Sequence, residues 1–365
     1  CTPGFVMSLF AMQKNYSSYN EENIKDSISG NLCRCTGYRP IVDAAKSLNN
    51  KNRSDKFVKS KKKIISLLKK IKPENISIKN RNKKYFAPRT VTELKKIIKD
   101  YPNSIFFSGG TDLSLIVTKE RKDIDNIISL SSINELNFIE EKNEHIVVGA
   151  ATSLREFELF IKKYYPDFTA ILKRYGSVQI RNVATIAGNI ATASPIGDTL
   201  PLLLSLDAKV VLQGLNKKTI LPLKNFFVNY RKTKLKKRQF IHSIIIPVLK
   251  KNIFKAYKIS KRIDDDISSV CASFSLEIKN KKIKNIKIAY GGMASTPKRA
   301  INCEKILINK NISEENIEKA KKILEKDFKP INDMRASKNY RMEIAKNLLM
   351  KCFIEIKDNK LVRLN

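Results

Sequence analysis

The sequence predicts an α+β protein of several domains, and three observations support this fold class. The chain has 365 residues, enough for two or three domains that each bury a core without disulfide bonds. Residues 1–46 place apolar side chains at helical spacing, and further along strand-like runs alternate with helices that begin at capping boxes. The residues expected on one face of the first helix, which Pro3 suits as a first-turn residue, are Phe5, Leu9 and Met12.

Composition and pattern divide the chain into four parts. We expect a small all-α domain over residues 1–48, followed by a polar, lysine-rich linker over 49–83 that is solvated. An α+β domain is expected over 84–249 and a second α+β domain over 250–365.

The first α+β domain is expected to contain helices that begin at the capping boxes Thr90 to Glu93 and Ser153 to Glu156. Its first strand-like runs are 85–86, 105–107, which is expected to be buried, and 146–148. In the second α+β domain the expected strands are 268–278 and 286–290, and the expected helices are 313–327 and 337–355.

The chain is strongly basic, with 71 Lys and Arg against 35 Asp and Glu and a formal charge of +36. This charge alone is typical of a polyanion-binding protein, and that alternative stays open. The lysines are scattered and aromatic residues do not alternate with them, so we expect neither nucleic acid nor a membrane as partner. Because no apolar run reaches the roughly 18 residues of a membrane span, we expect a cytoplasmic protein.

Three of the six cysteines suggest a metal centre. Cys33 and Cys35 lie one residue apart, and Cys1 is the first residue of the chain. A disulfide between Cys33 and Cys35 would close a small, strained ring, and zinc usually recruits histidine or paired cysteines. The two histidines, His145 and His242, lie far away in strand-like segments and are expected to be structural. Grouped thiolates without histidine favour an iron–sulfur cluster.

Two further segments suggest a large polar ligand. Ser108-Gly109-Gly110-Thr111-Asp112 follows a strand, so its backbone amides could cradle a pyrophosphate, or it could simply be a turn. Between Arg181 and Asp198 lie sixteen uncharged, mostly small residues, where about five charges would be expected. Such a stretch is typical of a ligand-lining loop or of a packing seam.

The cysteine segments resemble the helical 2Fe-2S domain of the molybdenum hydroxylase family. The resemblance rests on Cys1-Thr2-Pro3-Gly4 and on Cys33-Arg34-Cys35-Thr36-Gly37-Tyr38-Arg39-Pro40. It implies that Cys1, Cys33 and Cys35 are cluster ligands. It also implies that the chain is N-terminally truncated, with a fourth ligand three residues before Cys1.

The glycine turn and the uncharged stretch resemble the FAD-binding domain of the same family. The FAD contacts that the resemblance implies are Phe106, Phe107, Ser108, Gly109, Gly110, Thr111, Asp112, Leu113, Tyr175, Thr185, Gly188, Asn189, Asp198, Ile241 and Lys258. Gly188 and Asn189 are expected in a loop, and Tyr230 and Asp265 are expected where NAD meets the flavin. The segments 289–300 and 327–341 resemble the C-terminal domain of these flavoproteins.

The fusion of cluster and flavin parts in one chain resembles the small subunit of xanthine dehydrogenases. The resemblance implies an electron-transfer subunit that receives electrons from a molybdopterin-binding large subunit, within a heterotetramer or larger assembly. Electrons from hypoxanthine or xanthine would pass through 2Fe-2S and FAD to NAD. No residue of this chain is expected to catalyse purine hydroxylation. A related hydroxylase acting on another N-heterocycle or an aldehyde remains an alternative.

Overall fold

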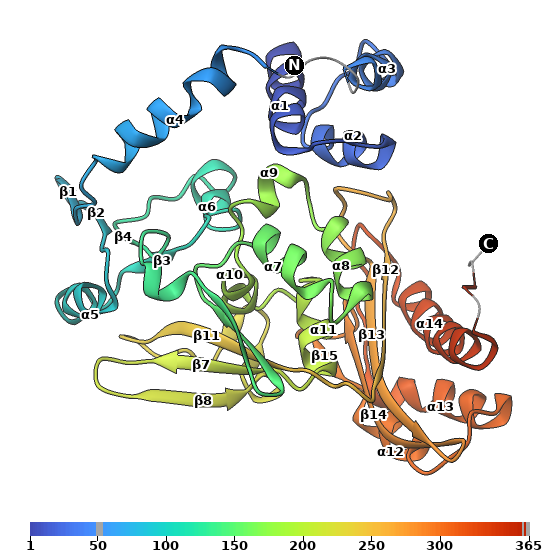
Figure 1. Ribbon diagram of the computed structural model, residues 1–365. Coiled ribbons are helices and arrows are strands. Elements are labelled where there is room, and N and C mark those ends of the chain that lie inside the picture. The colour runs from blue at the N-terminus through green and yellow to red at the C-terminus, as the bar shows by residue number, and fades with distance from the viewer. Residues whose placement is uncertain (49–53, 360, 363–365) are drawn as a thin grey trace.

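The computed structural model describes residues 1–48, 54–359 and 361–362. Figure 1 shows a helical lobe at the N-terminus, connected by a long helix to β-sheets with helices packed around them. The α+β fold class is therefore confirmed. Residues 49–53, the first part of the predicted linker 49–83, lie outside the described residues.

The N-terminal helical domain consists of α1 (Thr2–Asn15), α2 (Glu21–Ile28) and α3 (Arg39–Ser47). Pro3 lies in the first turn of α1, and Phe5 and Met12 point into the core while Leu9 packs against it, as the sequence predicts. Asn20 caps α2 by exchanging hydrogen bonds with Asn23. The remaining buried core residues are Tyr19, Ile24, Ile28, Cys33 and Ala45.

The predicted linker contains secondary structure that the sequence analysis did not assign. Helix α4 (Lys56–Lys69) begins at Asp55, whose carboxylate accepts the backbone N–H groups of Phe57 and Val58. None of the described side chains of α4 is buried. This part of the predicted linker is therefore solvated, as expected, but it is a helix. Phe57 packs edge-to-face on Phe10 of α1, with ring centroids 5.2 Å apart. The large apolar side chains that α4 leaves exposed are Phe57, Val58, Ile64, Ile65, Leu67 and Leu68.

The first sheet has the strand order β1-β2-β4-β3, with β1 and β2 antiparallel and the other pairs parallel. Its strands are β1 (Ile76–Asn80), β2 (Lys83–Ala87), β3 (Ile105–Phe107) and β4 (Asn126–Ser129). Strand β1 belongs to this sheet although it lies within the predicted linker. The expectation that 105–107 is buried is wrong, because β3 is an edge strand and Ile105 is exposed.

Short helices accompany this sheet. They are α5 (Val91–Asp100), α6 (Ser114–Thr118) and the 3₁₀ helix η1 (Asn134–Leu136). Thr90 caps α5 by accepting the N–H of Glu93 at 3.1 Å, while the Glu93 carboxylate accepts from Lys96, so only half of the predicted capping box forms. Leu94 and Ile98 bury the inner face of α5 against Ile128.

The second sheet is antiparallel and has the order β5-β6-β11-β7-β8. Its strands are β5 (Ile139–Lys142), β6 (His145–Gly149), β7 (Lys209–Gln213), β8 (Lys218–Pro222) and β11 (Phe240–Pro247). The accompanying helices are α7 (Leu154–Ile161), α8 (Pro166–Lys173), α9 (Val178–Arg181), α10 (Ile186–Thr192), α11 (Thr199–Ser205) and η2 (Leu223–Asn225). A small ribbon of β9 (Phe227–Asn229) and β10 (Lys232–Thr233) lies between β8 and β11 in the sequence.

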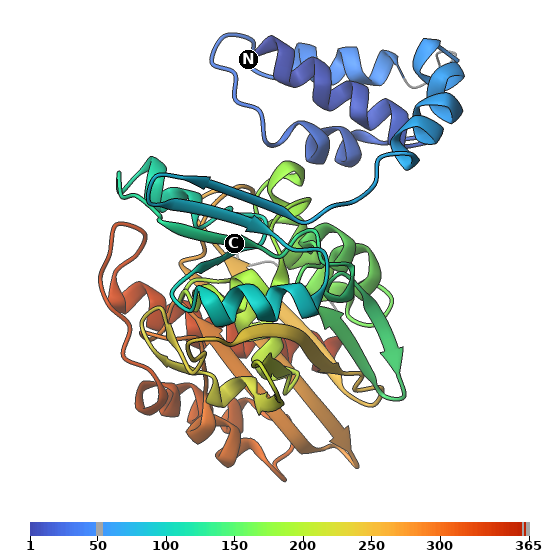
Figure 2. The ribbon, with the colours of Figure 1, turned by 90° about the vertical axis from the view of Figure 1, so that its left-hand side faces the viewer.

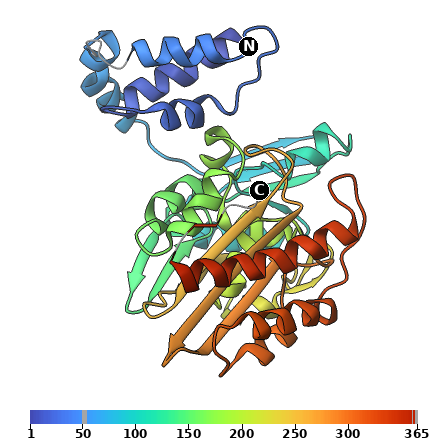
Figure 3. The same cartoon turned by 90° about the vertical axis from the view of Figure 1, so that its right-hand side faces the viewer.

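The third sheet runs antiparallel in the order β12-β13-β14-β15. Alternate residues of β13 serve two cores: Ala272 and Phe274 face α12 to α14, while Cys271 faces the core of the second sheet. Helix α14 crosses the outer face of the sheet (Figure 3). The elements are β12 (Ile253–Ile259), β13 (Val270–Lys279), β14 (Lys282–Gly291), β15 (Lys298–Arg299), α12 (Ile301–Leu307), α13 (Glu314–Asp327) and α14 (Lys338–Asp358).

In the described parts of the chain, every helix is too short or too polar to cross a membrane. Figure 2 shows the N-terminal helical domain and α4 as a lobe above the sheets.

The capping box of α7 gives a test of the local folding argument. Ser153 accepts the N–H of Glu156 at 3.1 Å, and the Glu156 carboxylate accepts the N–H of Ser153 at 2.9 Å. Ser153→Ala should therefore lower the free energy of unfolding by about 1 kcal/mol. Urea unfolding measures this, with Ser66→Ala on the exposed helix α4 as control. Equal effects of the two substitutions would contradict the prediction.

Candidate functional site

A cavity of about 540 Å³ lies where the loop after β3, helix α10, and strands β11 and β12 meet. Its volume is in the range of sites for small molecules and cofactors. Most of the residues predicted to bind FAD or NAD line it together: Phe106, Ser108, Gly110, Thr111, Asp112, Leu113, Tyr175, Thr185, Gly188, Asn189, Asp198, Ile241, Lys258 and Asp265. Three predicted residues are not in its lining, namely Phe107, Gly109 and Tyr230. Tyr230 lies 59% exposed in the turn after β9.

The glycine turn after β3 presents backbone to the cavity. Gly109 and Gly110 have φ values of 75° and 71°, a region that side chains disfavour. A Cβ on Gly109 would lie 1.9 Å from the carbonyl oxygen of Val183, so the turn is pressed against the start of the uncharged stretch. Ser108 Oγ is buried and has no hydrogen-bond partner among the described residues. A buried hydroxyl in the cavity wall is a group that a polar ligand would satisfy.

The uncharged stretch forms α10 and the turn that leads into α11. Thr185 caps α10 by accepting the N–H of Gly188 at 3.0 Å. The expectation that Gly188 and Asn189 lie in a loop is wrong, because both belong to α10, which this cap starts. Asn189 donates to the Tyr175 hydroxyl at 3.0 Å and accepts from Thr199 at 2.6 Å. These contacts fix the polar side chains of the wall, and the small neighbours leave the cavity open.

A buried ion pair forms another part of the cavity wall. The Lys258 ammonium donates to an oxygen of Asp198 at 2.6 Å and to the carbonyl of Arg174 at 3.1 Å. Ser268 donates to the other Asp198 oxygen at 2.5 Å. Burial, and secondarily the nearby Asp198 charge, raises the pKa of the Tyr175 phenol, which keeps it neutral. This part of the wall thus offers neutral donors and acceptors beside a compensated pair of buried charges.

Asp265 lies at the rim, in the loop between β12 and β13. Its φ is 48°. Although its side chain stays solvent-accessible, desolvation against the cavity wall and the charge of Asp264 raise its carboxyl pKa. The pKa of the adjacent Asp266 carboxyl is lowered, chiefly because it accepts the N–H of Arg262. The two neighbouring carboxylates therefore have opposite electrostatic environments.

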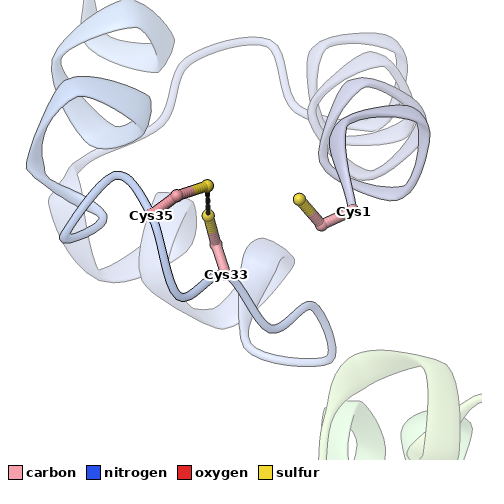
Figure 4. A group of neighbouring side chains, drawn as sticks. All are labelled: Cys1, Cys33 and Cys35. Atoms are coloured by element: carbon pink, nitrogen blue, oxygen red, sulfur yellow. Dashed lines mark hydrogen bonds between the residues drawn. The ribbon is translucent and has the colours of Figure 1, made fainter.

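The three cysteines of the N-terminal helical domain come together. Cys1 begins α1, Cys33 and Cys35 lie in the loop between α2 and α3, and their Sγ atoms lie within 4.8 Å of one another (Figure 4). Cys33 Sγ and Cys35 Sγ are 3.3 Å apart and are free thiols. The Thr36 hydroxyl, which donates to Cys33 Sγ, is the main cause that lowers the pKa of this thiol to about 6, while that of Cys35 is raised by its hydrogen bond to Cys33. Soft thiolate ligands at this spacing fit an iron–sulfur cluster.

Sequence reasoning missed several residues at the site. Ser268 and Arg174 hold the polar wall, and Arg181 lies completely buried beneath the cavity loop 173–176. Arg181 carries a usable signal, since it is the charged residue that begins the uncharged stretch. Arg174 and Ser268 lie in ordinary polar surroundings in the sequence, and only the fold brings them to the site.

The two carboxylates at the rim make a paired prediction. A carboxyl whose pKa folding raises costs stability above its ordinary pKa of about 3.9, so Asp265→Asn should raise the free energy of unfolding at pH 7. Asp266→Asn should lower it, because a depressed pKa contributes stability at neutral pH. Both differences in the free energy of unfolding from the wild type should disappear as the pH falls below the pKa values of the two carboxyl groups. Urea unfolding at several pH values measures them, and shifts of the same sign would contradict the prediction.

Three protein families match consecutive parts of the chain. Residues 1–46 match the family described as [2Fe-2S] binding domain. Residues 78–249 match the FAD binding domain in molybdopterin dehydrogenase, and residues 255–356 match the CO dehydrogenase flavoprotein C-terminal domain.

Similar curated proteins include xanthine dehydrogenases. That of Emericella nidulans is 30% identical over 387 residues, covering 90% of this chain and 28% of the relative. Xanthine dehydrogenase 1 of Arabidopsis thaliana is 27% identical over 432 residues, covering 98% of this chain and 32% of the relative. The chain thus spans about a third or less of the length of these relatives.

Two solved structures share the fold. The cyanide-inactivated Cu,Mo-CO dehydrogenase superimposes with a TM-score of 0.69 at 22% identity, covering 73% of this chain and 94% of the other. Quinoline 2-oxidoreductase from Pseudomonas putida 86 gives 0.70 at 19% identity, covering 78% and 100%. This chain carries matches to the 2Fe-2S, FAD-binding and C-terminal flavoprotein domains in this order. It therefore fits the iron–sulfur and flavin subunit of a molybdenum hydroxylase.

Proposed function

We propose that this chain is the electron-transfer subunit of a xanthine dehydrogenase. It takes electrons from a molybdopterin-binding partner and delivers them to NAD while hypoxanthine or xanthine is oxidised to urate. The observation that carries the proposal is the cavity of about 540 Å³, lined mainly by residues of the FAD-binding match, in a chain that also gathers three thiols within 4.8 Å. The xanthine assignment is supported by the curated relatives.

The residues of the cavity have distinct proposed roles toward FAD. The backbone of the turn 108–113 would approach the pyrophosphate, since its glycines leave no side chain in the way. Thr185 and Asn189 would orient the ligand from α10, and the Asp198–Lys258 pair would hold another part of the wall. When bound, FAD supplies the conversion between single electrons and a hydride.

The remaining proposed roles concern the cluster and NAD. Cys1, Cys33 and Cys35 would supply thiolate ligands to a 2Fe-2S cluster, and the lowered pKa of Cys33 favours its thiolate form near neutral pH. Asp265 at the rim of the cavity, and Tyr230 in the exposed turn after β9, would shape the approach of NAD.

A second candidate keeps the same chemistry and changes the substrate. The structures of quinoline 2-oxidoreductase and of CO dehydrogenase resemble the chain equally well. An N-heterocycle or aldehyde hydroxylase is therefore the alternative. Assay of the complex between this chain and its molybdopterin partner separates the two: xanthine-dependent NADH formation supports our proposal, whereas turnover of quinoline or an aldehyde without xanthine contradicts it.

The NAD assignment can be tested on this chain alone. After loading with FAD, anaerobic addition of NADH should bleach the flavin absorbance, because hydride transfer to NAD is reversible. Dithionite serves as the control that the flavin is reducible. Flavin that dithionite bleaches and NADH leaves oxidised would overturn NAD as the acceptor.

The glycine turn provides a test of the FAD site. Gly109→Ala places a methyl group against the Val183 carbonyl at positive φ, so the turn must shift and FAD affinity should fall about tenfold or more. Gly214→Ala is the matched control, since its Cβ would meet its nearest neighbour at an ordinary 3.6 Å. Fluorescence titration with FAD measures both, and equal affinities would contradict the assignment of the turn.

A further inference from the structure

Arg181, at the end of α9, joins two domains through one buried side chain. Its guanidinium donates to Glu158 Oε2 at 3.0 Å and to the carbonyl oxygens of Lys173 at 3.1 Å and Gly176 at 2.6 Å. It also donates to Asp26 Oδ1 at 2.5 Å, and Asp26 belongs to α2 of the N-terminal helical domain. The side chain is fully buried, so each of these contacts replaces water.

The contact through Asp26 is the centre of a wider interface between α1–α2 and the helices α7 to α9. Arg155 of α7 donates to the Tyr16 hydroxyl at 3.2 Å, and Gln179 of α9 donates to Ser8 at 3.2 Å. A Cβ on Gly30 would lie 2.2 Å from Gln179 Oε1, so the backbone at Gly30 is in close contact with the side chain of Gln179. Gly30 lies three residues before Cys33 in the sequence, so this interface lies next to the thiol group.

The two carbonyls that Arg181 holds belong to the segment 173–176, which runs from the last residue of α8 into the loop that borders the cavity. Tyr175 and Gly176 line the cavity. The carbonyl of Arg174, which lies in the same segment, accepts a hydrogen bond from Lys258. Lys258 at the same time pairs with Asp198. Two buried cations thus fix the backbone of this loop, one from the cavity side and one from the domain interface.

We propose that Arg181 is a positioning residue that couples docking of the N-terminal helical domain to the shape of the flavin pocket, by holding Asp26 and the 173–176 loop with one guanidinium. The charges explain why both partners are needed. Arg155 and Arg181 share Glu158, and the charge of Asp265 also acts on Arg181, while Asp26 supplies the carboxylate that pairs with Arg181 from the other domain. Without it, a buried excess of positive charge favours movement of Arg181 toward water and loss of its hold on the Gly176 carbonyl.

The proposal rests on the proposed FAD site, and its test uses substitutions outside that site. Asp26→Asn removes the charge and keeps the size. Glu22→Gln is the matched control, because Glu22 crosses the same interface in an exposed pair with Lys173 at 2.6 Å. Arg181→Lys keeps the charge and loses the forked geometry that spans both domains.

FAD titration and hydrogen–deuterium exchange of the 173–176 amides, the latter without FAD, are the two measurements. Asp26→Asn and Arg181→Lys should weaken FAD binding about fivefold or more and change the visible circular dichroism of bound flavin. Both should speed exchange at 173–176, while Glu22→Gln leaves binding and exchange unchanged.

The measurements distinguish failure of this proposal from failure of the FAD site. Unchanged exchange and FAD affinity in Asp26→Asn would overturn the coupling, and so would an equal response to Glu22→Gln. Wild-type chain that binds no FAD would overturn the proposed function, and the exchange comparison in the apo chain would still decide the coupling. If Arg181→Lys fails to fold, Asp26→Asn carries the test, since it keeps the size of the side chain and leaves the Arg181–Glu158 pair in place.

Discussion

Lys258 and Asp198 are opposite charges buried where two parts of the chain meet. Lys258 lies on β12 of the third sheet, and Asp198 lies immediately before α11, which packs against β13, β14 and β15 of that sheet and against α10. Removing one member of such a pair leaves an uncompensated charge at a cost of about 3 to 5 kcal/mol, so the pair must remain together. Because Lys258 also holds the Arg174 carbonyl, this constraint fixes the relative position of β12, α11 and the loop 173–176. The cavity wall is therefore set by how the domains pack.

Another part of the cavity wall depends on close approach of backbones. The turn at Gly109 lies against Val183, and Thr185 then caps α10 so that its small residues face the cavity. A charged side chain within this stretch would have to be buried in the wall or fill the space. The sixteen uncharged residues between Arg181 and Asp198 thus have a physical cause in the geometry.

Much of the fold could be predicted because its signals are local. The cap at Ser153, the helix that follows it and the apolar face of α1 depend on residues a few positions apart. The glycine turn and the uncharged stretch stand out in the sequence because close backbone approach favours small residues, whereas lining residues such as Tyr175, Ile241 and Lys258 could be expected only from the family resemblance.

What could not be predicted depends on contacts distant in sequence. Strand β3 looks buried because Ile105 and its neighbours are apolar, yet strand order places it at an edge. Helix α4 was not predicted because its many lysines are typical of a solvated linker. The partners of Arg181 come from α2, α7 and the segment 173–176. No local pattern reveals that an arginine has acceptors 155 positions away.

Helix α4 has a consequence for how the two domains communicate. Its 14 residues form a spacer about 21 Å long that covalently joins the N-terminal helical domain to the first sheet. The domain is therefore a tethered ligand of its own chain, and its docking is an intramolecular equilibrium governed by an effective concentration rather than by protein concentration. Dilution cannot undock it. Salt acts on the exposed pairs at the margin of the interface more than on the buried Arg181, so the equilibrium shifts gradually with ionic strength.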